Sequence, residues 1–464
     1  MVENRLVKTT GSVYTPPFLV KIILDFGGYS GEEIVRKHVM DNSCGDGAFL
    51  KEIVRRYCSS SRENSAQAIK NELETFIHGI EINAEECEKA KRNLDFVALD
   101  FGVKKVKWDV QCADALACYK EYQSKMDYVF GNPPYVRVHN LAEKYDAVKK
   151  FSFAGSGMTD LYIVFFEIGL EMLSGNGTMT LITPSSWLTS VSGVALREHI
   201  RENNVLNGLI DLGHFQAFDA MTYTLISRFC KTSEIQKIRY LTLSGENGPE
   251  VVDCLSLADM DIAGNFYLGA RKELQRFRKI LENKKKSGIL VKNGFATLAD
   301  KVFVGNVDCE NSIDVIKGST GKCKRCVFPY SQNGTPIPFE KLGEKTQKYL
   351  LGNKNALSDH GDGDWYLFGR SQGLKDVSKD KISVNTIIKD ISTIKLNWVP
   401  AGKGVYSGLY ILTDFPLEKI RGAICCDDFL SYLKMLKKYK SGGYYTFSSK
   451  DLETYLRFSL GEEK

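Results

Sequence analysis

Residues 39–50 read VMDNSCGDGAFL, and this stretch decides the fold. Residues 39–41 close a short apolar run, and a helical pattern begins after Gly47. Gly45 and Gly47 allow the backbone to turn sharply and to approach a ligand closely. No third glycine follows at the spacing that holds a pyrophosphate, so the dinucleotide-binding fingerprint is incomplete. The stretch therefore predicts a strand, a glycine turn and a helix beside a bound ligand.

Three further apolar runs lead to polar residues in the same way. Glu81 lies at the end of the run at 76–82, Asp114 follows residues 110–113, and Asn132 follows residues 126–131. Ligands of open α/β sheets bind outside the carboxyl ends of the strands, where a carboxylate commonly accepts hydrogen bonds from ribose hydroxyls. We therefore expect these side chains to surround one site. Residues 178–183, 205–212 and 225–229 are predicted to add strands to the same sheet.

Asn132-Pro133-Pro134-Tyr135 has the residue types needed to hold a planar amino group. The Asn132 carboxamide oxygen and the Pro133 carbonyl can accept hydrogen bonds from the two N–H groups of this amine, which makes its nitrogen more nucleophilic. Pro134 stiffens the turn and brings no amide hydrogen to compete for that carbonyl. Tyr135 offers a flat face on which a base taken out of a duplex can stack. Alone, these four residues would be an ordinary turn.

The order of these motifs resembles the gamma-class DNA adenine-N6 methyltransferases, the TaqI and Eco57I-like group. The family's Thr-Pro-Pro segment is matched by VYTPP at residues 13–17, about thirty residues before the glycine turn. Residues 160–165, 181–188, 211–218 and 222–224 resemble its remaining segments, so the likeness covers about residues 10 to 235. Asn42-Ser43 departs from the Pro-Ala of many relatives, which we interpret as tolerated variation in the turn.

The resemblance implies an α/β fold, with an S-adenosylmethionine-dependent methyltransferase Rossmann-like sheet that has helices on both faces. It also implies a C-terminal mixed α+β domain that recognises the DNA target. Gly245–Glu250 is a clear loop, so the boundary is expected near residues 245 to 270. The expected domains are a catalytic domain at 1–250 and a target-recognition domain at 265–464, where helices should be sparse until residues 430–436.

The resemblance further implies S-adenosylmethionine as cofactor, with no metal required. The expected catalytic residues are Asn132, Pro133, Pro134 and Tyr135. The target base is expected to stack on Tyr135 and Phe218, with Phe215 as the competing alignment. The expected cofactor-binding residues are Thr15, Asp41, Cys44, Gly45, Gly47, Glu81, Ile82, Asp114, Ala115, Asn132 and Phe165.

The implied reaction is methyl transfer to N6 of a flipped-out adenine in double-stranded DNA, as the modification part of a restriction-modification system. A separate cognate endonuclease is a possible partner, and we expect a monomer. Cytosine N4 remains open as a target, and the runner-up is an N-methyltransferase acting on RNA or on a protein glutamine. Cytosine C5 chemistry needs a cysteine nucleophile, usually in a Pro-Cys pair, and the chain has no such pair. The C-terminal half has no convincing nuclease motif.

Composition agrees with a cytosolic enzyme of two or three domains, and the resemblance implies that its cytoplasm is prokaryotic. The 464 residues include no signal-peptide pattern and no apolar run of membrane-spanning length, so we expect no membrane association. The twelve cysteines are expected to be reduced. Cys323 and Cys326 have the spacing of metal ligands, but no second Cys/His pair follows at a zinc-finger interval, which leaves a metal there open.

The net charge of +5 is unevenly distributed. Residues 1–264 carry 28 Lys+Arg against 35 Asp+Glu, and residues 265–464 carry 34 against 22. An acidic half suits a cationic sulfonium cofactor, and a basic half suits a phosphate backbone. The basic residues at 271–286 predict a helix that either contacts DNA or links the domains.

The most suggestive C-terminal stretch is DWYLFGRSQ at residues 364–372. Arg370 and Gln372 are candidates for DNA binding, since Arg and Gln read guanine and adenine edges. Trp365 and Tyr366 are expected to pack in a small core instead.

Overall fold

The structure is a computed structural model that describes residues 14–138, 145–155, 159–215, 218, 223–231, 237–357 and 364–461. The chain divides into two compact units, Met1–Leu274 and Gln275–Lys464. In the part of the chain described, no helix is both long and apolar enough to cross a membrane.

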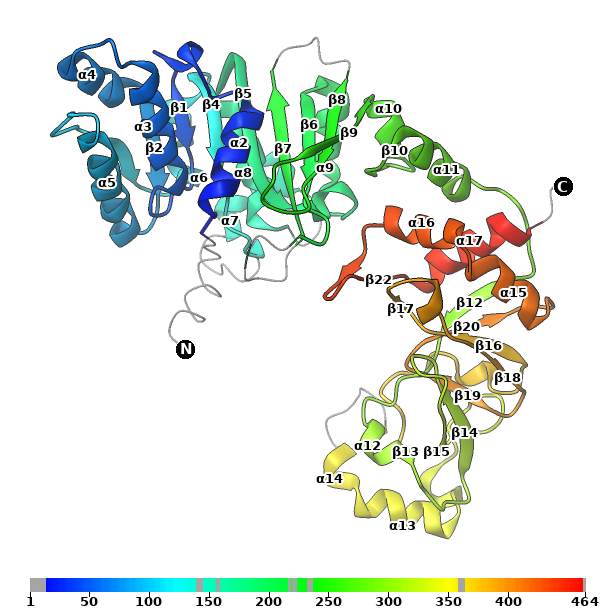
Figure 1. Ribbon diagram of the computed structural model, residues 1–464. Coiled ribbons are helices and arrows are strands. Elements are labelled where there is room, and N and C mark those ends of the chain that lie inside the picture. Colours follow the sequence, from blue (N-terminus) through cyan, green and yellow to red (C-terminus); the bar gives the residue numbers. More distant parts are fainter. Residues whose placement is uncertain are drawn as a thin grey trace. The chain divides into compact units, whose positions relative to one another are not determined.

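Unit 1 is built on a nine-stranded sheet with the order β3-β2-β1-β4-β5-β7-β6-β8-β9 (Figure 1). Strands β3, β2, β1, β4 and β5 run parallel, and β7 is antiparallel to both β5 and β6. The strands are β1 Val39–Asp41, β2 Ile77–Glu81, β3 Asp109–Cys112, β4 Met126–Gly131, β5 Leu173–Pro184, β6 Leu206–Asp211, β7 Thr224–Cys230, β8 Ile238–Thr242 and β9 Glu250–Leu255. All the strands expected between residues 39 and 229 are present.

The helices of unit 1 connect these strands and cover them. They are α2 Pro17–Gly27, α3 Ala48–Ser60, α4 Ala66–Phe76, α5 Ala84–Leu99, α6 Ala115–Cys118, α7 Tyr145–Val148, α8 Leu161–Met172, α9 Val194–Asn203 and α10 Leu257–Met260. A short hairpin, β10 Asp261–Ile262 and β11 Asn265–Phe266, precedes α11 Arg271–Leu281. Strand β1 lies between β2 and β4, so the chain adds β2 and β3 on one side of β1 and β4 and β5 on the other. Open α/β sheets bind ligands at such a reversal of strand order.

Helices cover both faces of the sheet, and buried side chains that alternate along the strands pack against them. Phe130 and Ile182 share a core cluster with α2 and α3. Their chain neighbours Val129 and Leu181 are also fully buried, and adjacent residues of a strand point to opposite faces. That second face is covered by α8, whose Phe166 packs 5.3 Å from Phe229 of β7.

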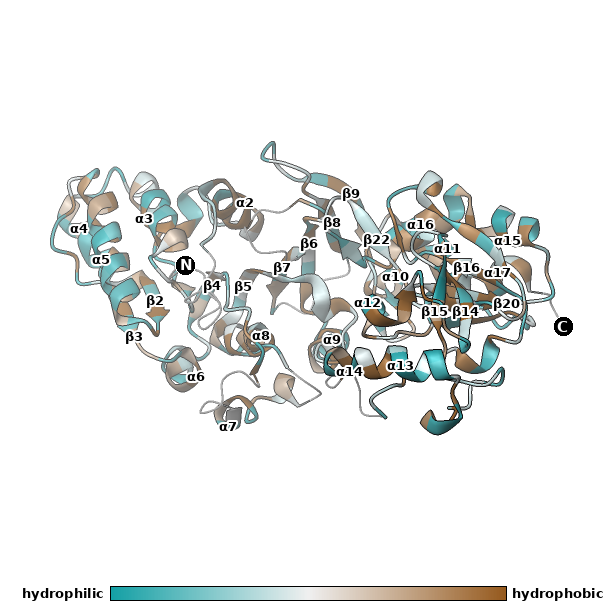
Figure 2. Cartoon of the chain, turned by 90° about the horizontal axis from the view of Figure 1, so that it is seen from below, coloured by the Kyte–Doolittle hydropathy of each residue, from teal (hydrophilic) through white to brown (hydrophobic). Residues whose placement is uncertain are grey.

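The two helix layers differ in how deeply they are buried. Nine of the twelve residues of α8 are buried, and this helix is largely brown in Figure 2. Only five of the sixteen residues of α5 are buried, which marks α5 as an outer helix. The apolar helix α8 therefore lies behind the carboxyl end of β4, and the amphipathic helix α5 borders the carboxyl end of β2.

Unit 2 contains three small sheets and short helices. Their orders are β12-β20-β16-β18, β13-β15-β14-β19 and β17-β22-β21. The strands are β12 Leu290–Asn293, β13 Val304–Gly305, β14 Ser312–Lys317, β15 Cys323–Val327, β16 Lys381–Val384, β17 Ile387–Ile388, β18 Leu396–Val399, β19 Gly404–Tyr406, β20 Leu409–Leu412, β21 Tyr439–Lys440 and β22 Tyr444–Thr446. The helices are α12 Asp300–Phe303, α13 Glu344–Gly352, α14 Lys354–Leu357, α15 Leu417–Ile424, α16 Asp427–Met435 and α17 Ser449–Leu460.

Two expectations for the C-terminal half are wrong. Helices are not sparse before residue 430, because α13 lies between Gly343 and Asn353 and is fixed by only two buried residues, Thr346 and Leu350. The basic helix ends at Leu281 and does not reach residue 286. There the Asn283 side chain accepts a hydrogen bond from the amide of residue 285, a local turn that competes with helix.

The division between the units falls within α11. The loop at residues 245–250 joins β8 to β9, which pair antiparallel in the large sheet, so the chain stays within unit 1 past this loop. Counted over the two units, the charged residues are 30 Lys+Arg against 36 Asp+Glu in unit 1 and 32 against 21 in unit 2. The asymmetry seen in the sequence is thus a property of the folded units.

All twelve cysteines lie in the described residues and are free thiols. Cys323 is exposed and Cys326 is buried on the same strand, β15, because residues three apart on a strand face opposite ways. Among the described residues, no group of three or more His, Cys, Asp or Glu side chains is placed to hold a metal ion.

Candidate cofactor and amine-binding site

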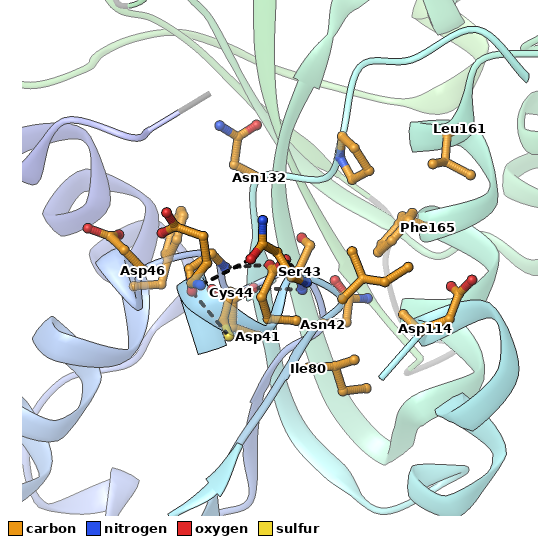
Figure 3. A pocket seen from close by; sticks show the side chains of 18 of the residues that line it. Asp41, Asn42, Ser43, Cys44, Asp46, Ile80, Asp114, Asn132, Leu161 and Phe165 are labelled. Atoms are coloured by element: carbon orange, nitrogen blue, oxygen red, sulfur yellow. Dashed lines mark hydrogen bonds between the residues drawn. The ribbon is translucent and has the colours of Figure 1, made fainter. Parts of the chain in front are cut away.

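A cavity of about 360 Å³ lies at the carboxyl ends of β1, β2, β3 and β4 (Figure 3). Its volume is in the range of small-molecule sites. Ten of the eleven residues expected to bind the cofactor line it: Thr15, Asp41, Cys44, Gly45, Glu81, Ile82, Asp114, Ala115, Asn132 and Phe165. Gly47 is not among the lining residues and is instead the N-cap of α3.

The floor of the cavity is the glycine turn. Gly45 has φ of 54° and Gly47 has φ of 85°, conformations that side chains disfavour. The Gly47 amide donates to the Cys44 carbonyl at 2.8 Å, and the Cys44 amide donates to the Ile80 carbonyl at 2.9 Å. The turn is therefore fixed against the end of β2, where Glu81 lies.

Glu81 is held in place by backbone amides. One carboxylate oxygen accepts from the Gly45 amide at 2.9 Å and the other from the Asn83 amide at 2.8 Å. Each oxygen keeps acceptor capacity for a ligand hydroxyl, because a carboxylate has about four lone-pair sites. The glycine turn thus orients the acid as well as shaping the cavity.

Asp41 is the most deeply buried acid of the cavity, with 1% of its surface exposed. Its Oδ1 accepts from the Ser43 amide at 3.1 Å. Burial raises the pKa of Asp41 to about 8, and the nearby Glu81 adds to this shift. A cationic ligand group beside Asp41 would favour its ionised form.

Asp114 also has a structural role, because it caps α6 by accepting from the Leu116 amide at 3.1 Å. Phe165 of α8 and Leu161 line the same part of the cavity (Figure 3). Acidic and apolar surfaces therefore lie close together, as the planar base and polar edges of a nucleoside require.

Asn132 directly follows β4 and joins the cavity to the N-terminal segment. Its Nδ2 donates to Thr15 Oγ1 at 3.1 Å, and Thr15 is buried. Pro134 lines the cavity, Pro133 is buried, and neither Pro133 nor Tyr135 is a lining residue. The cavity thus reaches the Asn-Pro-Pro-Tyr turn at Asn132 and Pro134.

Tyr135 lies beyond the cavity on the sheet side of that turn. Its hydroxyl donates to the Ile182 carbonyl at 3.1 Å, and its ring is 6.2 Å from that of Tyr162 in an edge-on arrangement. Burial raises the pKa of Tyr135 well above its usual range, so the hydroxyl stays protonated. These contacts fix the plane of the ring.

The two candidates for a stacking aromatic differ in exposure. Phe218 is 8% exposed and belongs to the core cluster of unit 1. Phe215 is partly exposed and packs edge-on against Phe18 at 6.2 Å. Residues 216, 217 and 222 of the same motif lie outside the described residues.

In unit 2, Arg370 and Gln372 are both exposed. The Arg370 amide donates to the Ala296 carbonyl at 3.1 Å, which fixes the backbone of this stretch. Tyr366 is buried and Trp365 is partly buried against the same core cluster, as expected.

Several lining residues were not anticipated as site residues. The polar ones are Tyr14, Asn42, Ser43, Asp46, Asn83 and Glu86. Three of them, Asn42, Ser43 and Asp46, lie within residues 39–50, and Tyr14 is adjacent to Thr15. Their closeness in sequence to expected site residues could therefore have identified them as lining residues. No sequence signal indicated Glu86, because it reaches the cavity from the first turn of α5.

Residues 48–218 match the family of Eco57I restriction-modification methylases. The chain is 30% identical over 234 residues to the Type II methyltransferase M.BstVI of Geobacillus stearothermophilus, which is 47% of this chain and 41% of that protein. It is 26% identical over 344 residues to the Type II methyltransferase M.PaeR7I of Pseudomonas aeruginosa, 67% of this chain and 58% of that protein. The chain spans about half the length of these curated relatives.

Solved structures agree on the fold. The Type IIL restriction-modification enzyme MmeI, solved with DNA, has a TM-score of 0.59 at 12% identity over 97% of this chain and 64% of that one. The type IIG restriction endonuclease BpuSI has a TM-score of 0.50 at 13% identity over 96% and 58%. The expected resemblance and the Rossmann-like methyltransferase fold are confirmed.

Proposed function

We propose that this chain is a site-specific DNA methyltransferase that transfers a methyl group from S-adenosylmethionine to N6 of an adenine in double-stranded DNA. The observation that carries the proposal is the position of Asn132, at the carboxyl end of β4 and on the wall of the acidic cavity. The residue that would accept hydrogen bonds from the target amine therefore lies beside the proposed cofactor site. The similarity to Type II methyltransferases supports DNA as the substrate.

The residues of the cavity fit S-adenosylmethionine. Bound there, the cofactor would supply a methyl group made electrophilic by a sulfonium. Glu81 would accept from the ribose hydroxyls, as its fixed carboxylate allows. Asp114 and Phe165 would contact the adenine, and Asp41 and Thr15 would lie near the cationic methionine end. Backbone amides of the glycine turn and Ile82 with Ala115 complete the walls.

The Asn-Pro-Pro-Tyr turn would prepare the target amine. The Asn132 carboxamide oxygen and the Pro133 carbonyl accept its two N–H groups, which localises the nitrogen lone pair toward the methyl group. Pro134 cannot donate to that carbonyl, and Tyr135 offers a ring on which the flipped base stacks, with Phe218 or Phe215 on its other side. No covalent intermediate is needed, because the nitrogen lone pair would take the methyl group directly, and the methylated amine would release its proton to water or to the Asn132 oxygen. Alignment would supply most of the acceleration.

Unit 2 is the proposed target-recognition domain. Its excess of basic residues suits phosphate contacts, and exposed Arg370 and Gln372 suit base edges. We place the chain in the cytoplasm, as a monomer that modifies DNA either alone or beside a separate endonuclease.

Methylation-aware sequencing of DNA from a host that expresses the chain tests the proposal. The host should lack its own DNA methylation, and a matched culture should express Asn132→Ala. We expect methylated adenines at one short recurring sequence with the wild-type chain and none with the variant. Unmodified DNA, together with methylated RNA or a methylated protein glutamine, would establish the alternative substrate instead.

A further inference from the structure

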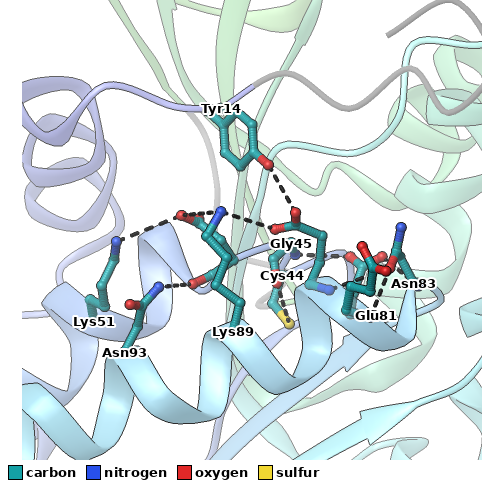
Figure 4. Close-up of polar contacts among 11 residues, drawn as sticks. Tyr14, Cys44, Gly45, Lys51, Glu81, Asn83, Lys89 and Asn93 are labelled. Atoms are coloured by element: carbon teal, nitrogen blue, oxygen red, sulfur yellow. Dashed lines mark hydrogen bonds and ion pairs between the residues drawn. The ribbon is translucent and has the colours of Figure 1, made fainter. Parts of the chain in front are cut away.

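Tyr14 lies at the mouth of the cofactor cavity and is fastened across it. Its side chain lines the cavity and is 58% exposed. The Tyr14 hydroxyl donates to Glu86 Oε1 at 3.1 Å, and the ring lies under Lys89 Nζ at 5.2 Å from its centroid (Figure 4). Both partners lie on α5, and Glu86 is 72 residues away in sequence. A segment that precedes α2 is thus attached to a different helix at the rim.

The rim to which Tyr14 is attached is itself anchored on two helices. Lys89 Nζ is 3.6 Å from Glu86 Oε2 and 3.7 Å from Asp46 Oδ2. Asp46 also pairs with Lys51 of α3 at 3.9 Å, and its carbonyl accepts from Asn93 of α5 at 2.8 Å. The glycine turn, α3 and α5 therefore form one connected rim, and only Tyr14 joins the N-terminal segment to it among these contacts.

The residue after Tyr14 contacts the other side of the cavity. Thr15 Oγ1 accepts from Asn132 Nδ2 at 3.1 Å, and Thr15 is 7% exposed. In this arrangement Nδ2 of Asn132 faces the Thr15 hydroxyl, so the acceptor oxygen of the carboxamide lies on the side away from Thr15. Two consecutive residues thus connect the cofactor rim with the residue proposed to hold the target amine.

We propose that Tyr14 and Thr15 form a strap that closes over bound cofactor and, once closed, orients the Asn132 carboxamide for the target amine. In this inference, which rests on the proposed function, Tyr14 is the latch and Thr15 is a positioning residue for Asn132. Methyl transfer is thereby coupled to an occupied and closed cavity.

The contacts of Tyr14 suit a latch that opens and closes. They lie at the exposed mouth, where a hydrogen bond and a cation–π contact are each of modest strength. Burial and the hydrogen bond to Glu86 raise the pKa of Tyr14, so its hydroxyl stays a donor at neutral pH. A partly exposed side chain can swing outward without unpacking the core, which cofactor entry requires.

The latch is tested by cofactor release alone. Stopped-flow displacement of S-adenosylmethionine should show release about fivefold faster from Tyr14→Phe, which loses only the hydroxyl. Tyr444→Phe is the matched control, because Tyr444 is an exposed tyrosine of unit 2 with Lys389 Nζ 6.0 Å from its ring centroid, and its release rate should equal the wild-type rate. Equal release rates for Tyr14→Phe and the wild type would overturn the latch.

The positioning role is tested by separating transfer from binding. Thr15→Val keeps the shape of the side chain and removes the acceptor, so single-turnover transfer to duplex DNA should fall about ten- to a hundredfold. Because Thr15 also lines the cofactor cavity, transfer is measured at saturating S-adenosylmethionine, so that a change in cofactor affinity does not contribute, and Thr15→Ser should restore transfer. A transfer rate of Thr15→Val at saturating cofactor equal to that of the wild type would overturn the coupling. If the wild type transferred nothing to DNA while Tyr14→Phe still released cofactor faster, the proposed function would fail and the latch would stand.

Discussion

The two units of the chain use charge and architecture in opposite ways. Unit 1 has six more acidic than basic residues and places Asp41, Glu81 and Asp114 at the ends of parallel strands around one cavity. Unit 2 has eleven more basic than acidic residues and consists of three small sheets and short helices. Carboxylates held around one cavity suit a small cationic cofactor, whereas positive charge spread over a surface suits a long polyanion. The difference suggests that chemistry and target choice are divided between the units.

The basic helix α11, at the division, shows why counting charges is not enough. Arg276 forms a bidentate pair with Asp428, at 3.1 and 2.9 Å. Arg271 donates to the Cys254 carbonyl at 2.8 Å and lies 3.4 Å from Asp259. These guanidinium groups are already paired within the protein, so we interpret α11 as a structural link. The DNA contacts proposed for unit 2 therefore rest on exposed residues such as Arg370.

The largest effect is expected at Asn132, where unit 1 would meet the amine. Asn132→Ala should lower the rate of methyl transfer by about a thousandfold or more, because both alignment and lone-pair localisation are lost. Cofactor affinity, measured by calorimetry, should stay within about threefold of the wild type. Asn203→Ala, an exposed asparagine of α9, is the control. A tenfold weaker cofactor affinity with transfer intact would reassign Asn132 to the cofactor site.

Separating the units should affect DNA binding next most strongly. A fragment of residues 1–274 should bind S-adenosylmethionine but lose about a hundredfold or more in DNA affinity, along with all site preference. Circular dichroism must first show that the fragment is folded. Fluorescence anisotropy with labelled duplexes at several salt concentrations is the measurement. Retained site preference in a folded fragment would end the proposed division of labour.

Glu81→Ala should raise the dissociation constant for S-adenosylmethionine about ten- to a hundredfold, because a charged acceptor for hydroxyls is lost. Glu85→Ala changes an exposed acid in the first turn of α5 and should leave affinity unchanged. The Glu81 variant also loses two hydrogen bonds from the backbone, so thermal unfolding must accompany the calorimetry. Unchanged affinity in a stable variant would mean that another residue holds the ribose.

The smallest effect expected is a pH dependence set by Asp41. The pKa of Asp41 is raised to about 8, so below that pH the carboxyl is mostly neutral and must release a proton to pair with a cation. Cofactor affinity should therefore fall as pH falls, by about tenfold between pH 8.5 and pH 6.5. Asp41→Asn should flatten this dependence. Calorimetry in buffers with different ionisation enthalpies will report the released proton, and a flat wild-type profile would contradict this role.

The parts of the site that follow strands were predictable from the sequence, and the parts that depend on long-range contacts were not. Asp41, Glu81 and Asn132 each end an apolar run, and chain topology alone brings such ends together. Glu86 and Lys89 carry no such signal, because only the folded arrangement brings α5 beside Tyr14. In unit 2, α13 was missed because two buried residues between glycines give too little periodicity to indicate a helix.

Nucleoside analysis after methyl transfer tests the central claim most directly. The purified chain is incubated with duplex DNA and S-adenosylmethionine carrying an isotopically labelled methyl group, and the DNA is digested to nucleosides for mass spectrometry. We predict labelled N6-methyldeoxyadenosine with the wild-type chain and none with Asn132→Ala. Label found in N4-methyldeoxycytidine, or no label in DNA from a folded chain that binds cofactor, would contradict the account.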